Sequence, residues 1–257
     1  MITSTTNPRV KQVVQLNTKA KARREAGLFV AEGLKLFREV PREWIHAVYA
    51  TEAFAEEHKE LLAGTEVELV DEKVFGKMCD TMTPQGILTV IRIPTYNRED
   101  LLGRGGSPFI MVLEDLQDPG NVGTILRTAE GAGVTGVILS KRTVDLFAPK
   151  TIRSTMGSIF RMPFVYEEDL SEALDWLKKH QVQTYAAHLK GEHSYAEENY
   201  REGCAFLIGN EGNGLTDALS ERADHLIRIP MEGQVESLNA SIAAAVLMYT
   251  AHAQRHQ

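Results

Sequence analysis

The chain has 257 residues, of which 43% are hydrophobic and 25% are charged, and its formal net charge is −7. These values are typical of a globular protein with one large α/β domain or two ordinary ones. No stretch approaches the roughly 20 consecutive apolar residues of a membrane span, and the opening MITSTTNPRVKQ lacks the apolar centre of a signal peptide. We therefore expect a cytoplasmic protein with no membrane partner.

The first part of the chain alternates predicted helices and strands as far as residue 96. In order, these are a basic helical arm (about 7–26), strand LFVAE (28–32), helix 33–40, strand WIHAVYAT (44–51), helix 52–64, strand EVELV (66–70), helix 71–80 and strand GILTVIRI (86–93). This pattern predicts a small α/β domain over residues 1–96. Residues 97–107 are expected to form a linker, because charged residues there lead into Gly103, Gly105 and Gly106.

From residue 108 the alternation repeats on a larger scale. The expected strands are FIMVLED (109–115), GVILS (136–140), PFVY (163–166), VQTYAAH (182–188), CAFLIG (204–209) and HLIRIP (225–230), and the expected helices start at 121, lie near 149–159 and at 168–180, and end the chain. Nearly continuous apolar, β-branched strands are typical of strands buried on both faces. We predict an α/β fold with a mostly parallel sheet and helices on either side.

Basic residues gather in two segments of this acidic chain. Residues 1–24 contain no acid and six basic residues, namely Arg9, Lys11, Lys19, Lys21, Arg23 and Arg24. Residues 141–161 contain one acid, Asp145, and the basic residues Lys141, Arg142, Lys150, Arg153 and Arg161. Because salt screens phosphate attraction within roughly 8 Å, local patches matter more than total charge. Charge alone is equally compatible with nucleic-acid binding and with solvated helix faces.

Ligands of open α/β sheets bind beyond the carboxyl ends of the strands, and the loop LEDLQDPGNVGTILRTAEGAGV (113–134) leaves such an end. Asn121 is expected to cap the helix that follows, which leaves Arg127 off its apolar face. On the residues alone, an ion pair of Arg127 with Glu130 or Glu114 is the simpler interpretation. The carboxylates at positions 114, 115 and 118 suggest either a metal site or hydrogen-bonded turn residues, and we favour turn residues.

Two further loops follow strand ends. FLIGNEGNGLT (206–216) has three glycines around Glu211, which permits a sharp turn close to a ligand. RIPMEGQVESLNASIAAAVLMY (228–249) places Ser237 and Asn239 before an apolar helix. Capping explains one of these two side chains but not both. From Ile242 to Met248 the helix is apolar on every side, so it must be enclosed by the core or by a second subunit.

Cysteine and histidine spacing predicts neither a disulfide nor a metal site. Cys79 and Cys204 stand alone, as buried free thiols do. His252 and His256 share a helical face at the end of the chain, but no third ligand is near them in sequence.

The three loops, in this order, resemble the three motifs of the SpoU (TrmH-type) branch of the SPOUT RNA methyltransferases. The motif positions are matched by Asn121 and Arg127, then by Gly209 and Glu211, and then by Ile229, Pro230, Ser237, Leu238 and Asn239. PKTIRSTMGSIFRMPF (149–164) also resembles a stretch that these enzymes carry between the first two motifs. Upstream, FVAEGLKLFREV through TPQGILTV resembles the substrate-binding domain of the family's ribosomal RNA ribose methylases, a fold akin to a ribosomal protein.

The resemblance implies a trefoil-knotted catalytic domain over residues 108–257, a homodimer, and S-adenosylmethionine held by the backbone at Gly209, Ile229 and Leu238. It implies methylation of a ribose 2′-hydroxyl, with 23S ribosomal RNA favoured over transfer RNA as the substrate; a non-catalytic RNA-binding or ribosome-assembly protein is the alternative. The catalytic residues would be Asn121, Arg127, Glu211, Ser237 and Asn239. RNA affinity is expected to depend on Arg9, Lys11, Arg23, Arg24 and Arg153.

Overall fold

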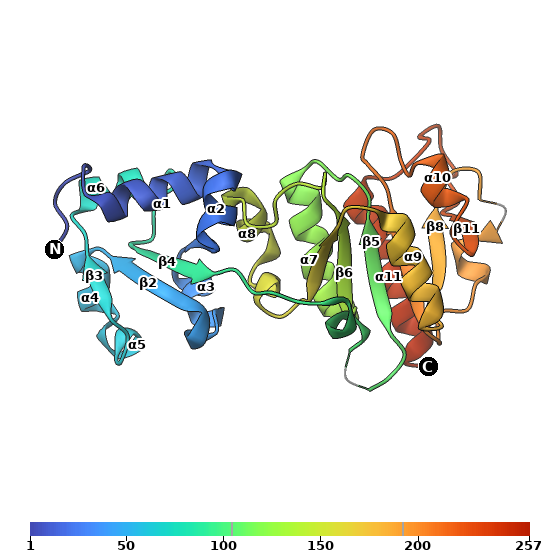
Figure 1. Ribbon diagram of the computed structural model, residues 1–257, viewed down its shortest axis with the longest axis horizontal. Coiled ribbons are helices and arrows are strands. Elements are labelled where there is room, and N and C mark those ends of the chain that lie inside the picture. The colour runs from blue at the N-terminus through green and yellow to red at the C-terminus, as the bar shows by residue number, and fades with distance from the viewer. Residues whose placement is uncertain (104, 192) are drawn as a thin grey trace. The chain divides into compact units, whose positions relative to one another are not determined.

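The elements of a computed structural model, which describes residues 1–103, 105–191 and 193–257, form two compact units (Figure 1). Unit 1 comprises Met1–Thr95 and Asp145–Phe160, and unit 2 comprises Tyr96–Val144 and Arg161–Gln257. This division differs from the expected one at two places. Residues 145–160 pack with unit 1, and the expected linker contains a short 3-10 helix (Arg98–Leu102) that belongs to unit 2. Arg104 of that segment lies outside the described residues.

Unit 1 is built on a sheet with the strand order β1-β4-β2-β3. β1 (Leu28–Glu32) and β2 (Ile45–Ala50) run antiparallel to β4 (Ile87–Arg92), and β3 (Val67–Leu69) runs parallel to β2. The helices are α1 (Pro8–Thr18), α2 (Ala20–Ala26), α3 (Leu34–Glu39), α4 (Glu52–Glu57), α5 (Lys59–Leu62), α6 (Glu72–Met78) and α8 (Pro149–Thr155), with 3-10 turns at Arg42–Trp44 and Ser158–Phe160.

Strand alternation in unit 1 sends side chains into two apolar layers. Leu28 and Val30 of β1 join a core with α1 and α6. Phe29 points to the other side, where its ring centroid lies 4.7 Å from that of Phe147 and 6.4 Å from that of Phe160. The segment 145–160 is therefore part of the core of unit 1, although it lies 50 residues beyond that unit's first segment in sequence.

Unit 2 is a parallel sheet with the order β7-β6-β5-β10-β8-β11-β9, as the apolar strands predicted. The strands are β5 (Phe109–Leu113), β6 (Gly136–Ser140), β7 (Phe164–Glu167), β8 (Gln183–Ala187), β9 (His193–Ser194), β10 (Cys204–Ile208) and β11 (His225–Arg228). The helices are α7 (Pro119–Ala132), α9 (Leu170–Lys179), α10 (Asp217–Ser220) and α11 (Ala240–Arg255), and a 3-10 turn covers Tyr195–Glu197.

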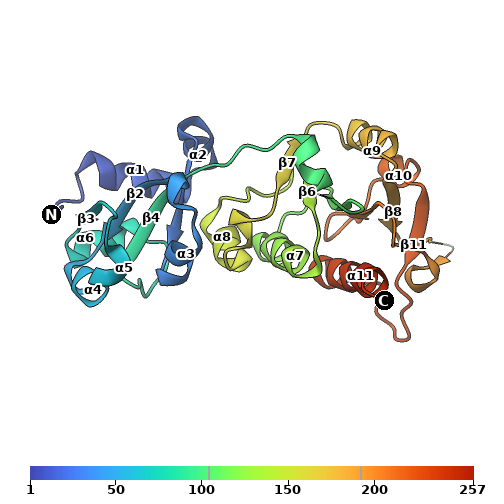
Figure 2. The same cartoon turned by 90° about the horizontal axis from the view of Figure 1, so that it is seen from below.

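Helices cover both faces of this sheet, with α7 and α11 packed together on one side and α9 on the other (Figure 2). Leu170, Leu174 and Leu177 of α9 share a core with Val112 of β5 and Leu207 of β10. On α11, Ala244, Leu247, Met248 and Ala251 are buried. Within the described residues, no helix combines the length and hydropathy that crossing a bilayer requires.

Candidate functional site

The three loops singled out from the sequence leave β5, β10 and β11, which all run in the same direction in unit 2. Their carboxyl ends therefore lie at one edge of the sheet, where α/β folds bind ligands. Each loop then enters a helix: α7 follows β5, α10 follows β10, and α11 follows β11. The candidate site is this edge of unit 2.

The α7 helix begins two residues earlier than predicted, and Asn121 is not its cap. Asp118 is the N-cap, and its Oδ1 accepts a hydrogen bond of 2.9 Å from the backbone N–H of Asn121. Pro119 occupies the first helical position, where its lack of an N–H does no harm. Asn121 thus lies within the first turn, and its side chain is available for other contacts.

The carboxylate of Glu211 is the acceptor that joins the second loop to the first. It accepts hydrogen bonds from the backbone N–H groups of Gln117 and Asp118, at 3.0 Å each, and from Nδ2 of Asn121 at 3.1 Å. Burial favours the neutral form of this carboxyl, but the hydrogen bonds outweigh burial, so the pKa of Glu211 lies below its ordinary value. Glu211 is therefore ionised at neutral pH and holds the first loop through three donors.

Asn239 joins the third loop to the same chain of hydrogen bonds. Its Oδ1 caps α11 by accepting from the backbone N–H groups of Ser241 and Ile242, at 2.9 and 3.4 Å, and from the Ser241 hydroxyl at 2.7 Å. Its Nδ2 donates to Oδ1 of Asn121 at 3.0 Å. Glu211, Asn121 and Asn239 thus form one continuous chain across the three loops. Ser237 is exposed and lies outside this chain.

Arg127 is exposed on α7, and its guanidinium makes no hydrogen bond or ion pair with any described residue. Both carboxylates considered as its partners are engaged elsewhere. Glu130 accepts from Arg161, and Glu114 accepts from the backbone N–H and hydroxyl of Thr216 at 2.8 Å each. The structure therefore does not form the ion pair that the residues alone suggested, and all five N–H donors of Arg127 remain available.

The acidic residues of the first loop are hydrogen-bonded turn residues. Glu114 holds Thr216, Asp118 caps α7, and Asp115 accepts from the Ser140 hydroxyl at 2.6 Å. Among the described residues, no three His, Cys, Asp or Glu side chains gather as a metal-binding group.

The positions expected to hold a cofactor lie at the loops that leave β10 and β11. A Cβ atom at Gly209 would lie 2.1 Å from backbone atoms of Gly214 and Leu215, so only glycine fits where the second loop folds back. Ile229 and Leu238 are at the two ends of the third loop. No hydrogen bond joins the backbone of residues 231–238 to another described residue. This loop therefore offers free main-chain N–H and C=O groups. Such groups suit a cofactor whose polar atoms are bound by the protein backbone.

Sequence reasoning missed two residues that brace the site. Nδ2 of Asn210 donates to the carbonyl of Asp115 at 2.8 Å, and Nε2 of Gln117 donates to the carbonyls of Asp115 and Arg142 at 2.9 and 2.7 Å. The clustering of Asn and Gln in the two loops was a signal, since amides next to strand ends commonly satisfy backbone groups. Their partners could not be read from a linear pattern.

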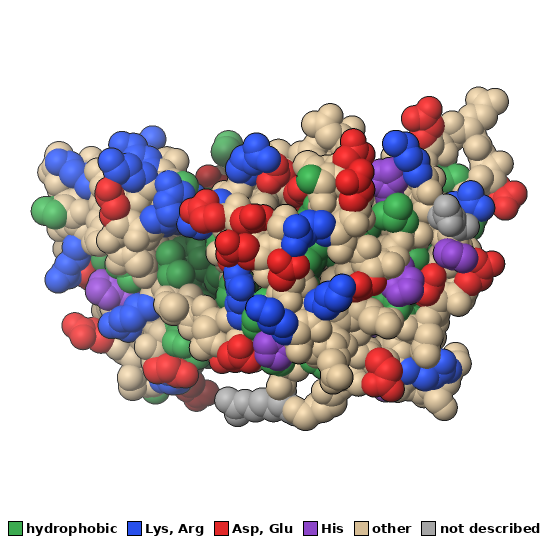
Figure 3. Space-filling model, turned by 45° about the vertical axis from the view of Figure 1, so that its right-hand side comes forward, with side chains coloured by type: hydrophobic (Ala, Val, Ile, Leu, Met, Phe, Trp, Pro, Cys, Tyr) green, Lys and Arg blue, Asp and Glu red, His purple; other side chains and the backbone are tan. Residues whose placement is uncertain are grey.

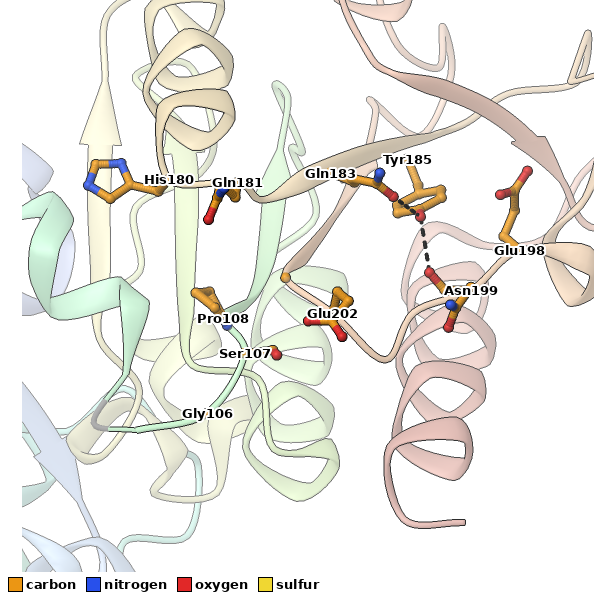
Figure 4. Close-up of a pocket in the computed structure, with 11 residues that line it drawn as sticks. Gly106, Ser107, Pro108, His180, Gln181, Gln183, Tyr185, Glu198, Asn199 and Glu202 are labelled. Atoms are coloured by element: carbon orange, nitrogen blue, oxygen red, sulfur yellow. Dashed lines mark hydrogen bonds between the residues drawn. The ribbon is translucent and has the colours of Figure 1, made fainter.

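A concavity of about 600 Å³ in unit 2 lies away from this site. Figure 4 shows its polar lining, in which the Tyr185 hydroxyl lies within hydrogen-bonding distance of two acceptors, Oε1 of Gln183 at 2.8 Å and the carbonyl oxygen of Asn199 at 3.1 Å. Ser107, Pro108, Gln183 and Gly203 place it at the amino ends of β5, β8 and β10. Because ligands of such sheets bind at carboxyl ends, we assign the chemistry to the opposite edge.

The residues expected to bind RNA differ in availability. Arg23 is only 4% exposed, and its guanidinium pairs with Asp145 at 2.7 Å and donates to the carbonyls of Leu16 and Asn17. These contacts correct its expected role, because a buried and saturated guanidinium cannot meet a phosphate. Lys11 and Arg24, in contrast, are exposed and have no side-chain partner among the described residues.

Several other basic side chains are neutralised by carboxylates within their own unit. Arg9 pairs with Glu68, and Arg153 pairs with Asp80 at 2.7 Å. In the segment 141–161, the remaining pairs are Lys141 with Glu168, Arg142 with Asp115, and Arg161 with Glu130. This second basic segment is therefore not the free cationic surface that its composition suggested. Exposed ion pairs of this kind are weak and can exchange with phosphate.

Comparison with known proteins identifies relatives that cover nearly the whole chain. Residues 108–249 match the SpoU rRNA Methylase family, and residues 7–89 match the MRM3-like substrate binding domain. The chain is 35% identical over 249 residues to the 23S rRNA (guanosine(2553)-2'-O)-methyltransferase RlmP of Bacillus subtilis, covering 96% of this chain and 97% of that protein.

Two solved structures with bound S-adenosylmethionine (AdoMet) are similar to the chain. One is an rRNA methyltransferase from Sinorhizobium meliloti, with a TM-score of 0.85, 34% identity and coverage of 99% of this chain and 97% of the other. The second is the SpoU methyltransferase AviRb from Streptomyces viridochromogenes, with a TM-score of 0.88, 25% identity and coverage of 98% and 99%.

Proposed function

We propose, from the premise that the chain belongs to the SpoU rRNA methylase family, that it transfers a methyl group from AdoMet to a ribose 2′-hydroxyl of 23S ribosomal RNA. The predicted family, the mostly parallel α/β fold and the cofactor are confirmed by the family match and by the AdoMet-bound similar structures. The single observation that carries the catalytic assignment is the chain of hydrogen bonds through Glu211, Asn121 and Asn239, which brings together motif residues up to 118 positions apart.

The residues of the candidate site fit the cofactor and the reaction. When bound, AdoMet supplies an electrophilic methyl group. The backbone around Gly209, Ile229 and Leu238 would hold it, since the loop between Ile229 and Leu238 has unpaired main-chain groups. Asn121, Glu211 and Asn239 would keep the three loops in register, and Ser237 would contact the ribose. Alignment of reacting groups can lower the activation free energy by roughly 7 to 11 kcal/mol.

Arg127 would act on the nucleic acid rather than as a base. A guanidinium stays charged and presents five donors in a planar fork, which matches a phosphate. We infer that Arg127 binds the phosphate next to the target ribose, that this phosphate accepts the proton of the 2′-hydroxyl, and that Arg127 stabilises the negative charge that develops on the 2′-oxygen of the ribose. The support is that Arg127 is exposed and has no partner among the described residues, so no ion pair must break before it meets RNA.

The RNA-binding surface would lie on the first two helices of unit 1. Lys and Arg side chains crowd this part of unit 1 in the space-filling view (Figure 3). The exposed members on α1 and α2 are Arg9, Lys11, Lys21 and Arg24. Ribosomal RNA is favoured over transfer RNA because the MRM3-like domain accompanies the methylase domain and because RlmP acts on 23S rRNA by name. An enzyme with this substrate would work in the cytoplasm, where ribosomes are assembled.

A homodimer is the assembly we propose. Ile242 and Tyr249 of α11 are each 50% exposed, although the opposite side of the helix is buried. They are seven residues apart, two helical turns, so they form one apolar face. A second copy of unit 2 would cover this face, and Ile242→Glu combined with Tyr249→Glu should then give monomers in sedimentation equilibrium. The trefoil knot implied by the resemblance stays a prediction.

The test of the proposed function compares Arg127→Ala with Arg201→Ala, a control on an exposed arginine in the loop before β10. AdoMet titration and labelled-methyl transfer to ribosomal RNA are measured for both. We expect Arg127→Ala to lose about 10²–10³-fold in methyl transfer with unchanged AdoMet affinity, and the control to match the wild type. Equal loss of cofactor binding and transfer would instead show a structural role for Arg127.

The substrate is tested by mapping 2′-O-methyl groups in RNA from cells with and without the protein. Loss of one mark in 23S rRNA would support the proposal. Loss of a mark in transfer RNA alone would reassign the substrate, and unchanged maps together with no AdoMet binding would refute methyltransferase activity.

A further inference from the structure

Asp115, the second residue after β5, has a backbone conformation that few non-glycine residues adopt. Its φ angle is +55°, in the left-handed region. Asp and Asn tolerate this region better than other side chains, and residues held there cluster at functional sites. The conformation turns the chain sharply at the start of the first loop, with one residue between Asp115 and the two residues whose N–H groups meet Glu211.

Hydrogen bonds from two neighbouring strands hold this turn in place. The backbone N–H of Asp115 donates to Oγ of Ser140 at 2.8 Å, and that hydroxyl donates to Oδ1 of Asp115 at 2.6 Å. Ser140 is the last residue of β6. Nη2 of Arg142 lies 2.7 Å from Oδ2 of Asp115. On the other side, the carbonyl of Asp115 accepts from Nδ2 of Asn210, which follows β10.

Every polar atom of Asp115 is thus used, and the contacts join the ends of β5, β6 and β10, which are adjacent in the sheet. The turn is also anchored beyond Asp115, because Leu116 is fully buried and its carbonyl accepts from the N–H of Val144 at 2.9 Å. Gln117 and Asp118 follow directly, and their N–H groups donate to Glu211. The orientation of these two amides therefore depends on the turn at Asp115.

We propose that Asp115 is a positioning residue for methyl transfer: its left-handed turn and its carboxylate, held by Ser140 and Arg142, orient the first loop so that Glu211 and Asn121 are aligned. This inference rests on the proposed function and deepens it. Asp115 does not touch the reacting groups in this scheme. It acts through Gln117 and Asp118, which it delivers to the Glu211 carboxylate.

Three substitutions separate the backbone conformation from the side chain. Asp115→Asn keeps both the tolerance of a positive φ and an oxygen for the Ser140 hydroxyl, but it weakens the contact with Arg142. Asp115→Gly keeps the backbone conformation and removes every side-chain contact. Ser140→Ala leaves Asp115 in place and removes its hydroxyl partner. Asp175→Asn is the matched control, because it weakens an exposed ion pair between Asp175 of α9 and Arg222.

Activity is measured as kcat and KM for ribosomal RNA, together with AdoMet affinity and the unfolding temperature. We expect Asp115→Gly and Ser140→Ala to lower kcat by about 10- to 100-fold with KM and AdoMet affinity nearly unchanged, since small misplacements of aligned groups have effects of this size. Asp115→Asn should rescue most of the rate, and Asp175→Asn should match the wild type. Wild-type kcat in Asp115→Gly, or equal losses in rate, cofactor affinity and stability, would overturn the proposal.

A second measurement does not depend on activity. Amide hydrogen exchange of Gln117 and Asp118 should be faster in Asp115→Gly than in the wild type, while that of the Glu130 amide inside α7 stays unchanged. If the wild type failed to methylate RNA, the proposed function would fall, but faster exchange would still show that Asp115 orients the partners of Glu211. Unchanged exchange would overturn the positioning role whatever the activity.

Discussion

The side chain of Asn239 performs two functions with two different atoms, and substitutions can separate them. Its Oδ1 caps α11 and its Nδ2 donates to Asn121. Asn239→Ala removes both. Asn239→Asp keeps an oxygen at the cap, and a carboxylate there also interacts favourably with the helix dipole. It has no N–H, however, so it cannot donate to Asn121.

The two substitutions should therefore differ in stability and agree in activity. Loss of an N-cap lowers the free energy of unfolding by about 1 kcal/mol, which lowers the unfolding temperature by about 2–4 °C for a unit of this size. We expect this decrease for Asn239→Ala and a change below about 1 °C for Asn239→Asp. Methyl transfer should fall about tenfold or more in both, because the third loop loses its link to the first.

Scanning calorimetry and single-turnover methyl transfer at saturating AdoMet measure the two effects. Ser237→Ala is the stability control, since Ser237 is exposed and makes no side-chain hydrogen bond to a described residue. Methyl transfer at the wild-type rate by Asn239→Asp would show that the Nδ2 donor of Asn239 is not needed. An unchanged unfolding temperature in Asn239→Ala would refute the cap as a source of stability.

Three further predictions follow from ionisable groups. The pKa of Glu211 is lowered in the folded state, so its hydrogen bonds stabilise the protein above the unfolded pKa of about 4.3, and this stability is lost as pH falls through the folded pKa. Glu211→Gln should therefore lose less stability than the wild type between about pH 5 and 3. An equal loss of stability in the two proteins would contradict this reasoning. Burial raises the pKa of Cys79 to about 12 and that of Cys204 to about 11. Iodoacetamide at pH 8 should therefore label neither thiol until the protein unfolds, because the thiolate is the reactive form. Fast labelling of the folded protein would contradict this prediction. Arg23→Leu should lower the free energy of unfolding of unit 1 by about 3–5 kcal/mol, because it leaves a partly buried carboxylate unpaired, whereas the exposed Arg24→Leu should have little effect in the same urea titration.

The alternation of apolar strands and helices predicted the architecture because it records local burial. Strands such as FIMVL and CAFLI are buried on both faces, and their composition alone indicates a parallel sheet. The start of α7 was also readable: Pro favours the first helical position, so DPGN should have assigned the cap to Asp118 instead of Asn121. That error concerned a choice between two local signals.

Other features could not be read locally because they depend on partners distant in sequence. Arg23 looks like one of several exposed bases in a helical arm, and only the fold brings Asp145, 122 residues away, to bury it. The same applies to the basic segment 141–161, whose charges are balanced by carboxylates from four other parts of the chain. Composition reports the charges present in a segment, whereas their availability depends on tertiary contacts.

Availability is also what distinguishes Arg127 from the paired arginines of unit 2, such as Arg98, Arg142 and Arg161. A carboxylate near an active-site arginine would normally compete with the substrate phosphate for its donors. Here Glu211 is occupied by Gln117, Asp118 and Asn121, and Glu130 is occupied by Arg161. The ion pair with Arg161 thus keeps Glu130, one turn along α7, from neutralising Arg127. Glu211→Gln should weaken the alignment of the loops, so the rate of methyl transfer should fall although Arg127 is unchanged. A wild-type rate in this variant would show that the negative charge of Glu211 has no part in organising the site.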